Sequence, residues 1–195
     1  MFFQFKIQLK HAIAPPVWRK LMLQKNITFE EFHQIIQLVM GWENRHEYRF
    51  LVRDQNLLSK IGQVEKFKNQ NLSVLNKAQL CLSDYFSDQQ KSLVYVYDLE
   101  NEWVHTVHLE NTIENHDCPL EILGGQGACP PENSGGIWAY QRVKEFLKNP
   151  EKPEWHEVMW EMFGHLLEED FDPNDFDLEL VQQKLMKWYS ENKSQ

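Results

Sequence analysis

The sequence predicts an α+β fold, in which a mixed or mainly antiparallel sheet of two hairpins plus one strand carries one helix across a face and further helices packed alongside. Three observations lead to this prediction: β-type segments come first, a capped helix lies between them, and helical patterns fill the C-terminal part. Strands and helices do not alternate regularly, which excludes a doubly wound parallel sheet. We expect one domain over 1–195, with the sheet and first helix in 1–112, a loop rich in glycine and proline in 113–137, and a helical part in 138–192.

The first predicted element is a hairpin. Apolar and polar residues alternate over 3–9, the period of a half-buried strand. Ala14-Pro15-Pro16 must interrupt the pairing, because proline has no N–H to donate. Residues 17–23 are typical of a second strand, so we expect the two strands to pair across an irregular turn.

A helix is predicted to begin after Thr28. Thr28-Phe29-Glu30-Glu31 has the pattern of a capping box, in which Thr28 accepts from the backbone of Glu31 and the Glu31 carboxylate reaches back. Gly41 supplies the C-terminal stop. Between them, apolar residues recur at helical spacing at Phe32, Ile35, Ile36 and Val39.

Two further β regions follow this helix. Residues 48–52 are typical of a strand, and 93–97 with 103–109 of a second hairpin. Residues 54–79 are polar and weakly periodic, which indicates a long connection with at most one short element.

The second hairpin is expected to place three side chains on one face. If Asp98 pairs opposite Trp103, then Asp98 and His105 are diagonal neighbours with Cβ atoms roughly 7–8 Å apart. A water, a metal or a polar substrate group fits such a gap, and a carboxylate there holds an imidazole in one tautomer. The alternative is an ordinary hydrogen-bonded Asp beside a half-buried His.

Three helical patterns close the sequence. Each has one apolar stripe, which indicates packing against a core. The stripes consist of Ala139, Val143, Phe146 and Leu147, then Trp155, Val158, Met159, Met162, Phe163 and Leu166, and then Leu178, Val181, Leu185 and Trp188.

Composition limits the classes of function. The chain has 195 residues, 42% of them hydrophobic, with 7 Trp, 6 Tyr and 12 Phe, so it must bury a core. No apolar run approaches the length of about 18 residues that spans a membrane, and Lys6 interrupts the apolar start. Three cysteines without a CxxC pair fit a reducing compartment, so we expect a cytoplasmic protein without a membrane partner.

The negative charge is concentrated in one segment. The net charge is −9, and residues 151–180 hold eleven acidic residues against one basic residue. The remainder is nearly neutral and has no Lys/Arg stripe, so direct nucleic-acid binding is not expected. The acidic segment is either a solvated helix face or a surface that docks a basic partner.

The sequence lacks the usual motifs for nucleotide binding and for zinc binding. Gly124–Gly127 lacks the third glycine of a dinucleotide loop and the Lys and Ser/Thr of a P-loop. A zinc pattern of His105, His108, His116 and Cys118 also fails, because the first two lie three apart on a strand and point to opposite faces. No cofactor is expected, and no catalytic set is assigned.

Several blocks, in this order, resemble a known family. They are Ile13–Lys20, Phe32–Gln37, Met40-Gly41-Trp42 with His46, Tyr97-Asp98 with Trp103 and His105, Gly127–Glu132 with Gly135-Gly136, and Phe171-Asp172-Pro173 with Phe176-Asp177. The family is the open-reading-frame-three-like family of root-inducing (pRiA-type) plasmids, an uncharacterised prokaryotic family that also occurs in transposable elements. The resemblance implies a compact α+β domain and no settled activity.

The departures from the family pattern bear on metal binding. The family's His, Asp and Cys positions have the ligand types of a zinc or other transition-metal site. Here Tyr48, Asn101 and Ser134 take the places of the second His, second Asp and second Cys. We therefore expect no tightly held metal. If the family's set is structural instead, these replacements are mild.

The candidate ligand-binding residues are His46, Asp98, Trp103, His105 and Cys129. We expect them around one concavity, with His46 within about 10 Å of His105, since polar residues at loops and strand ends framed by aromatic rings are where binding sites form. The function expected is a binding or accessory module with a cleft at the 98–105 hairpin and the 124–136 loop. Its ligand would be a small molecule or a protein.

Two alternatives remain. The first is a hydrolase- or nuclease-type enzyme that uses His46, Asp98 and His105, with Cys129 or Glu132 as its third activated group. The second is a DNA-associated helper protein of a mobile element, which rests on the resemblance, and the acidic segment counts against direct DNA contact.

Overall fold

The elements of the computed structural model follow the predicted order. The structure describes residues 1–12, 14–54, 57–62, 74–75, 80–148, 161, 164 and 171–193. The elements are β1 (Phe2–Leu9), β2 (Trp18–Gln24), α1 (Phe29–Met40), β3 (Tyr48–Asp54), β4 (Leu57–Gly62), β5 (Val74–Leu75), α2 (Leu82–Tyr85), β6 (Ser92–Tyr97), β7 (Trp103–Ile113), β8 (Leu120–Gln126), α3 (Gly136–Lys148) and α5 (Leu178–Lys193).

The strands form one sheet with the order β5-β4-β3-β6-β7-β1-β2-β8. Both predicted hairpins are present, β1 with β2 and β6 with β7, and β3 joins the second hairpin at β6. All neighbours are antiparallel except β4 and β5. The α+β prediction with a mainly antiparallel sheet is confirmed.

The loop predicted over 113–137 contains a strand, which is a correction. β8 pairs with β2 at the end of the sheet, and Leu120 and Ile122 point into the core. Gly124 and Gly125 continue this strand although glycine disfavours strands. At Gly125 the ring of Phe176 occupies the space that a Cβ atom would need, whereas a Cβ atom at Gly124 would make only an ordinary contact with Trp18.

The pairing predicted for the second hairpin is wrong by one residue. Tyr97, not Asp98, lies opposite Trp103, which leaves 98–102 as a five-residue turn. Asp98 has a φ of 54°, and its side chain accepts the backbone N–H of Asn101 at 3.2 Å. Asp98 therefore caps a turn instead of extending a strand.

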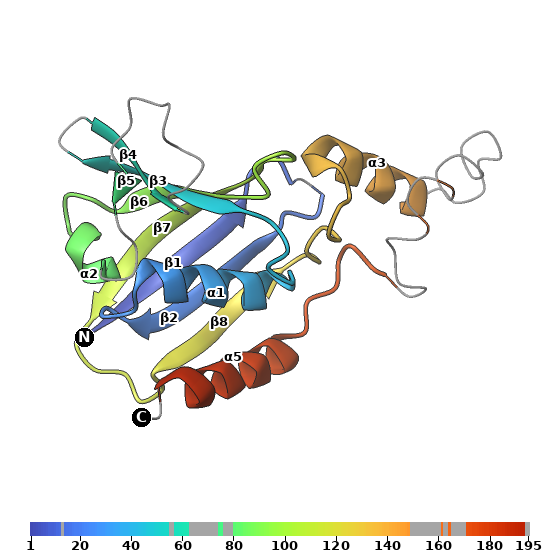
Figure 1. Ribbon diagram of the computed structural model, residues 1–195. Coiled ribbons are helices and arrows are strands. Elements are labelled where there is room, and N and C mark those ends of the chain that lie inside the picture. Colours follow the sequence, from blue (N-terminus) through green and yellow to red (C-terminus); the bar gives the residue numbers. More distant parts are fainter. Residues whose placement is uncertain are drawn as a thin grey trace.

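The predicted capping box of α1 is confirmed. Thr28 is the N-cap, its hydroxyl accepts from Glu31 N at 3.2 Å, and the Glu31 carboxylate accepts from Thr28 N at 2.8 Å. Gly41 ends the helix in the left-handed region with a φ of 98°. Figure 1 shows α1 lying across one face of the sheet, as expected.

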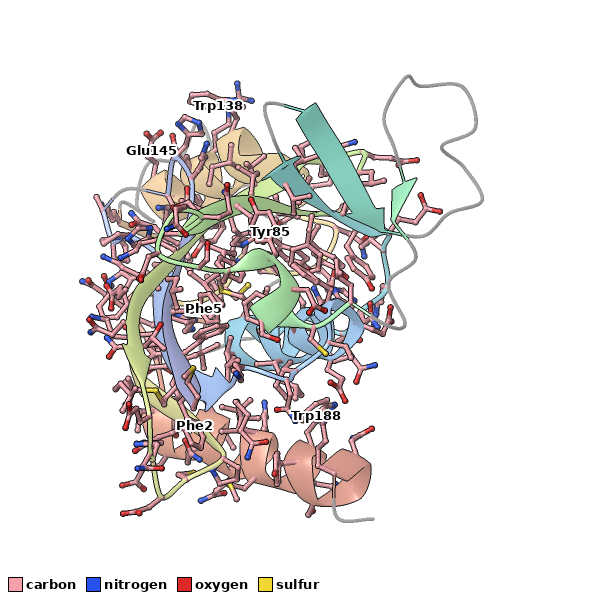
Figure 2. The ribbon with its side chains drawn as sticks, turned by 90° about the vertical axis from the view of Figure 1, so that its left-hand side faces the viewer. Phe2, Phe5, Tyr85, Trp138, Glu145 and Trp188 are labelled. Atoms are coloured by element: carbon pink, nitrogen blue, oxygen red, sulfur yellow. The ribbon has the colours of Figure 1, made fainter. Side chains whose placement is uncertain are left out.

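The core fills the space between α1 and the sheet. Phe5 and Phe50 of the sheet contact Phe32 of α1, with ring centroids 5.2 and 5.9 Å apart, and all three side chains are fully buried. Figure 2 shows the sheet curving around the helix. In the part of the chain that the structure describes, no helix combines the length and the apolar character needed to cross a membrane.

The first and third C-terminal helices are present as α3 and α5. α5 lies beside β8 (Figure 1), and the Trp188 indole donates to Gln34 of α1 at 2.9 Å. The second predicted helix, over 155–166, lies outside the described residues apart from 161 and 164. Most of the predicted connection over 54–79 also lies outside them. Its described parts are the last residue of β3 and two strands, β4 and β5, which corrects the expectation of one short element.

Candidate functional site

The predicted site residues come from three segments. They are His46 in the loop after α1, Asp98, Trp103 and His105 in the β6–β7 hairpin, and Cys129 in the loop after β8. Trp42 lies among them, because its ring centroid is 6.2 Å from that of Trp103 and 5.2 Å from that of His105. The Trp42 indole also donates to the Pro130 carbonyl at 3.0 Å, which ties the third segment to the first.

The loop that carries His46 is fixed at both ends. The side-chain oxygen of Gln37 on α1 accepts from Asn44 N at 3.0 Å. The Tyr97 hydroxyl accepts from Arg45 N at 2.9 Å and from His46 N at 3.3 Å. The end of α1 and the end of β6 therefore together determine where the His46 imidazole lies.

His46 is surrounded by oxygen atoms from two other segments. Its Nε2 lies 3.0 Å from Asn133 Oδ1, 3.5 Å from Glu132 Oε2 and 3.9 Å from Asp98 Oδ2. The His46 side chain is 28% exposed, whereas that of Asp98 is 3% exposed. We call these four residues the His46 cluster. Its exposed rim is formed by His46 and Asn133.

Glu132 is held in this cluster by neutral donors. Its Oε1 accepts from the Tyr97 hydroxyl and from Glu43 N, each at 2.9 Å. Burial, together with the hydrogen bond to Glu132 and its charge, raises the pKa of Tyr97 well above its ordinary value. Tyr97 therefore remains a neutral donor at any physiological pH.

His105 does not join the His46 cluster. It pairs opposite Tyr95, is fully buried, and neither of its ring nitrogens has a hydrogen-bond partner among the described residues. Burial lowers the pKa of His105 from 6.5 to about 3, although the nearby carbonyls of Trp103 and Tyr95 oppose the shift. His105 is a neutral core side chain. Its predicted diagonal pairing with Asp98 is wrong, because Asp98 lies in the turn.

Cys129 has the properties of an inert thiol. Burial raises its pKa well above the ordinary value, the charge of Glu132 raises it further, and the guanidinium of Arg19 only partly opposes this. A protonated thiol is a poor nucleophile and a poor metal ligand. The concavity expected to contain all five predicted residues stays a prediction, as does the distance between His46 and His105.

Sequence reasoning missed Arg19, although it lies inside the Pro-Pro-Val-Trp-Arg block. Arg19 is only 2% exposed, and burial lowers its pKa to about 10. Its guanidinium donates to four backbone carbonyls at 2.7–2.9 Å, those of Trp18, Val39, Gln126 and Gly127. The ring of Phe176 lies over it, with the ring centroid 4.2 Å from Cζ. Arg19 thus joins β2, the end of α1 and the end of β8.

A cavity of about 250 Å³ opens beside Arg19, on the side of the loop 126–130 that faces α5. Its walls come from α1, from the loop after β8 and from residues 171–184. Eight lining residues belong to blocks that carry the family resemblance: Arg19, Met40, Gly41, Ala128, Phe171, Asp172, Phe176 and Asp177. The sequence could not show the cavity, because these blocks are far apart in the chain.

The His46 cluster and the cavity supply hydrogen-bonding groups and charged groups. Among the described residues, no group of three or more His, Cys, Asp or Glu side chains is arranged to hold a metal ion. The His46 cluster presents oxygen acceptors around one imidazole, and the cavity presents charged and apolar walls. Both arrangements are suited to binding a polar ligand.

Comparisons with known proteins agree with these blocks. The model of the plasmid pRiA4b ORF-3-like protein family matches residues 1–180. The uncharacterized protein y4hQ of Sinorhizobium fredii (strain NBRC 101917 / NGR234) is 30% identical over 150 residues, which are 75% of this chain and 73% of that protein. The crystal structure of MM3350, a protein of unknown function from Methanosarcina mazei Go1, is similar with a TM-score of 0.77 and 31% identity, over 92% of this chain and 96% of that one.

Proposed function

The chain belongs to the plasmid pRiA4b ORF-3-like protein family, and we propose that it is a binding or accessory module that contacts its ligand through the His46 cluster. This places the binding cleft at the 98–105 hairpin and the 124–136 loop. The ligand is a small molecule or a partner segment that offers N–H or O–H donors. The arrangement of oxygen atoms around His46 Nε2, contributed by Asp98, Glu132 and Asn133, carries the proposal.

Rigidity of the cluster supports binding. The His46 backbone is held by Tyr97, and Glu132 is held by the same hydroxyl. A polar site whose groups are already oriented loses little conformational entropy when a ligand arrives. The partly exposed imidazole and the exposed Asn133 give such a ligand access.

The catalytic alternative has weaker support. A hydrolase that uses His46, Asp98 and His105 needs all three to reach one substrate, yet His105 is fully buried. Two of the Asp98 interactions go to the backbone of its own turn, from Glu100 N and Asn101 N. Cys129, the candidate third group, keeps its proton at neutral pH because burial raises its pKa.

The mobile-element alternative also has weaker support. A protein that grips duplex DNA by itself needs several Lys or Arg side chains along one surface to neutralise phosphates. The net charge here is −9, and the acidic residues concentrate in 151–180. A helper role is compatible with the binding proposal where the partner is another protein.

The experiment is a ligand screen read by two-dimensional NMR, with a library of small amines, alcohols and amides and a basic peptide. We expect hits that shift the backbone signals of residues 44–47, 98–102 and 130–134. Affinity should fall in His46→Ala and in Asn133→Ala. His108→Ala is the matched control, because His108 is an exposed histidine on β7 whose side chain bonds Ser92, away from the His46 cluster. Hits that bind these variants unchanged, or turnover of a hit by the wild-type chain, would contradict the proposal.

A further inference from the structure

The cavity beside Arg19 is separate from the His46 cluster. Its lining residues include neither His46 nor Asp98, Glu132 or Asn133. Its volume of about 250 Å³ lies below the usual range of roughly 300–1,000 Å³ for drug-sized ligands. The cavity is therefore suited to a small metabolite.

Arg19 places a positive charge in the wall of this cavity. Among the described residues, Arg19 makes no ion pair, and its hydrogen bonds go to carbonyls. An arginine has five N–H groups, and the four bonds leave one N–H of Nη2 without an acceptor in the described residues. A buried cation with a spare donor favours an anionic group beside it. Lys184 adds a second positive charge to the lining.

The same cavity is bordered by negative charge. Asp172, Asp175 and Asp177 belong to its lining, and all three are exposed. The C-terminal end of α1, which carries the negative end of the helix dipole, also lines it through Met40. A ligand with only an anionic group would be repelled here, and one with only a cationic group would leave Arg19 unbalanced.

The rest of the wall is apolar. It includes aromatic rings of Phe171 and Phe176 and aliphatic side chains of Leu38, Leu180 and Val181. Removing an apolar group of a ligand from water against such a wall is favourable. Leu180 is one of the exposed large hydrophobic residues, at 46% exposure, so it can give up further apolar surface on binding.

We propose that this cavity binds a free α-amino acid with an apolar side chain. The carboxylate is paired with Arg19 and Lys184, the ammonium group with the aspartates of the rim, and the side chain lies along the apolar wall. A zwitterion satisfies both signs of charge at once. A single peptide terminus fits less well, because its backbone offers one of the two charged groups.

The test is calorimetric titration of the full chain with leucine, leucinamide and N-acetylleucine. Leucinamide lacks the carboxylate and N-acetylleucine lacks the ammonium group. Leucine should bind, and each analogue at least about tenfold more weakly, since a hydrogen bond to a charged group is lost. Equal binding of all three compounds, tighter binding of either analogue, or no saturable binding of leucine up to about 10 mM would overturn the proposal.

Substitutions of lining residues test whether leucine binds in this cavity. Asp175→Asn and Lys184→Gln change exposed side chains, so the fold should persist, and each should weaken leucine binding by about two- to fivefold, the range expected for an exposed ion pair. Val181→Phe should abolish it by filling the cavity. Asp117→Asn is the matched control, because it removes an exposed acid outside the lining. His46→Ala should bind leucine normally, which separates this proposal from the function proposed above. Unchanged binding in Asp175→Asn and Lys184→Gln would overturn the assignment.

Discussion

Phe176 lies over the guanidinium of Arg19, with its ring centroid 4.2 Å from Cζ. The same ring occupies the space beside Gly125, where a Cβ atom would come within 2.6 Å of two ring carbons. The segment that precedes α5 is joined to this point as well, because the Pro173 carbonyl accepts from Ala128 N at 3.0 Å. Three segments distant in the sequence therefore depend on one glycine.

We predict that Gly125→Ala destabilises the protein by about 1–3 kcal/mol, because the added methyl group displaces the Phe176 ring. The free energy of unfolding from denaturant titration measures this. Gly124→Ala is the control, since its Cβ would lie at an ordinary contact distance of 3.7 Å from Trp18.

A double-mutant cycle identifies the cause. In a Phe176→Ala background, Gly125→Ala should cost much less, because the ring that it displaces is gone. The same cost in both backgrounds would show that the strand itself, and not Phe176, requires glycine at this position.

The buried His105 side chain should make the folded state less stable at acidic pH. Burial lowers its pKa from 6.5 to about 3. Between these two pH values, this histidine is protonated in the unfolded chain and neutral in the folded chain. The contribution to stability is fully present above pH 6.5 and is lost as the pH falls toward 3. We expect the free energy of unfolding to fall by about 1.4 kcal/mol per pH unit in that window from this group.

His105→Phe tests this dependence. The replacement keeps a flat ring in the core and removes two nitrogens that lack partners in the described part of the chain. It should be neutral or stabilising at pH 7, because no hydrogen bond is lost, and it should flatten the acid limb of the stability curve. An acid limb identical to that of the wild type would contradict the assignment.

Short-range patterns in the sequence are sufficient to predict α1 and the existence of both hairpins. The capping box and Gly41 act within a few residues, so pattern alone predicts them. Hairpin pairing depends on the turn. The pattern leaves open a pairing of Asp98 opposite Trp103, whereas the Asp98 side chain bonds the backbone of the turn, a role that is common for Asp.

The remainder of the site depends on contacts between distant segments. Gly124 and Gly125 are typical of a loop, so pattern alone does not predict β8, and only the ring of Phe176 explains the glycine at 125. The role of Arg19 cannot be predicted from the sequence for a related reason. Its partners are backbone carbonyls, which leave no trace in the sequence as a charged neighbour would.

Thr28→Ala should lower the free energy of unfolding by about 1 kcal/mol, because the backbone N–H of Glu31 loses its acceptor. Thr28→Ser is the matched control, since serine supplies the same hydroxyl and should leave the free energy of unfolding nearly unchanged. Chemical denaturation followed by circular dichroism measures both. An unchanged midpoint for Thr28→Ala would show that packing alone holds the first turn.

The outer edge of β8 is covered by a side chain. Gln182 of α5 accepts from Ile122 N at 2.8 Å through Oε1, and its Nε2 donates to the Leu120 carbonyl at 3.2 Å. The amide thereby makes the two bonds that a neighbouring strand would make, and an uncovered edge is a site for unwanted pairing.

We predict that Gln182→Ala exposes this edge and costs about 1–2 kcal/mol, since two side-chain to backbone hydrogen bonds are lost. The direct measurement is hydrogen exchange, in which the Ile122 amide should become markedly faster while buried amides of β1 stay protected. Gln182→Glu should give an intermediate result, because a carboxylate still accepts from Ile122 but repels the Leu120 carbonyl. Gln183→Ala is the control, as Gln183 is the exposed neighbour on the same helix. If Ile122 exchanged equally slowly in Gln182→Ala, the packing of α5 through Leu185 would be what protects β8, and the amide would have no part in it.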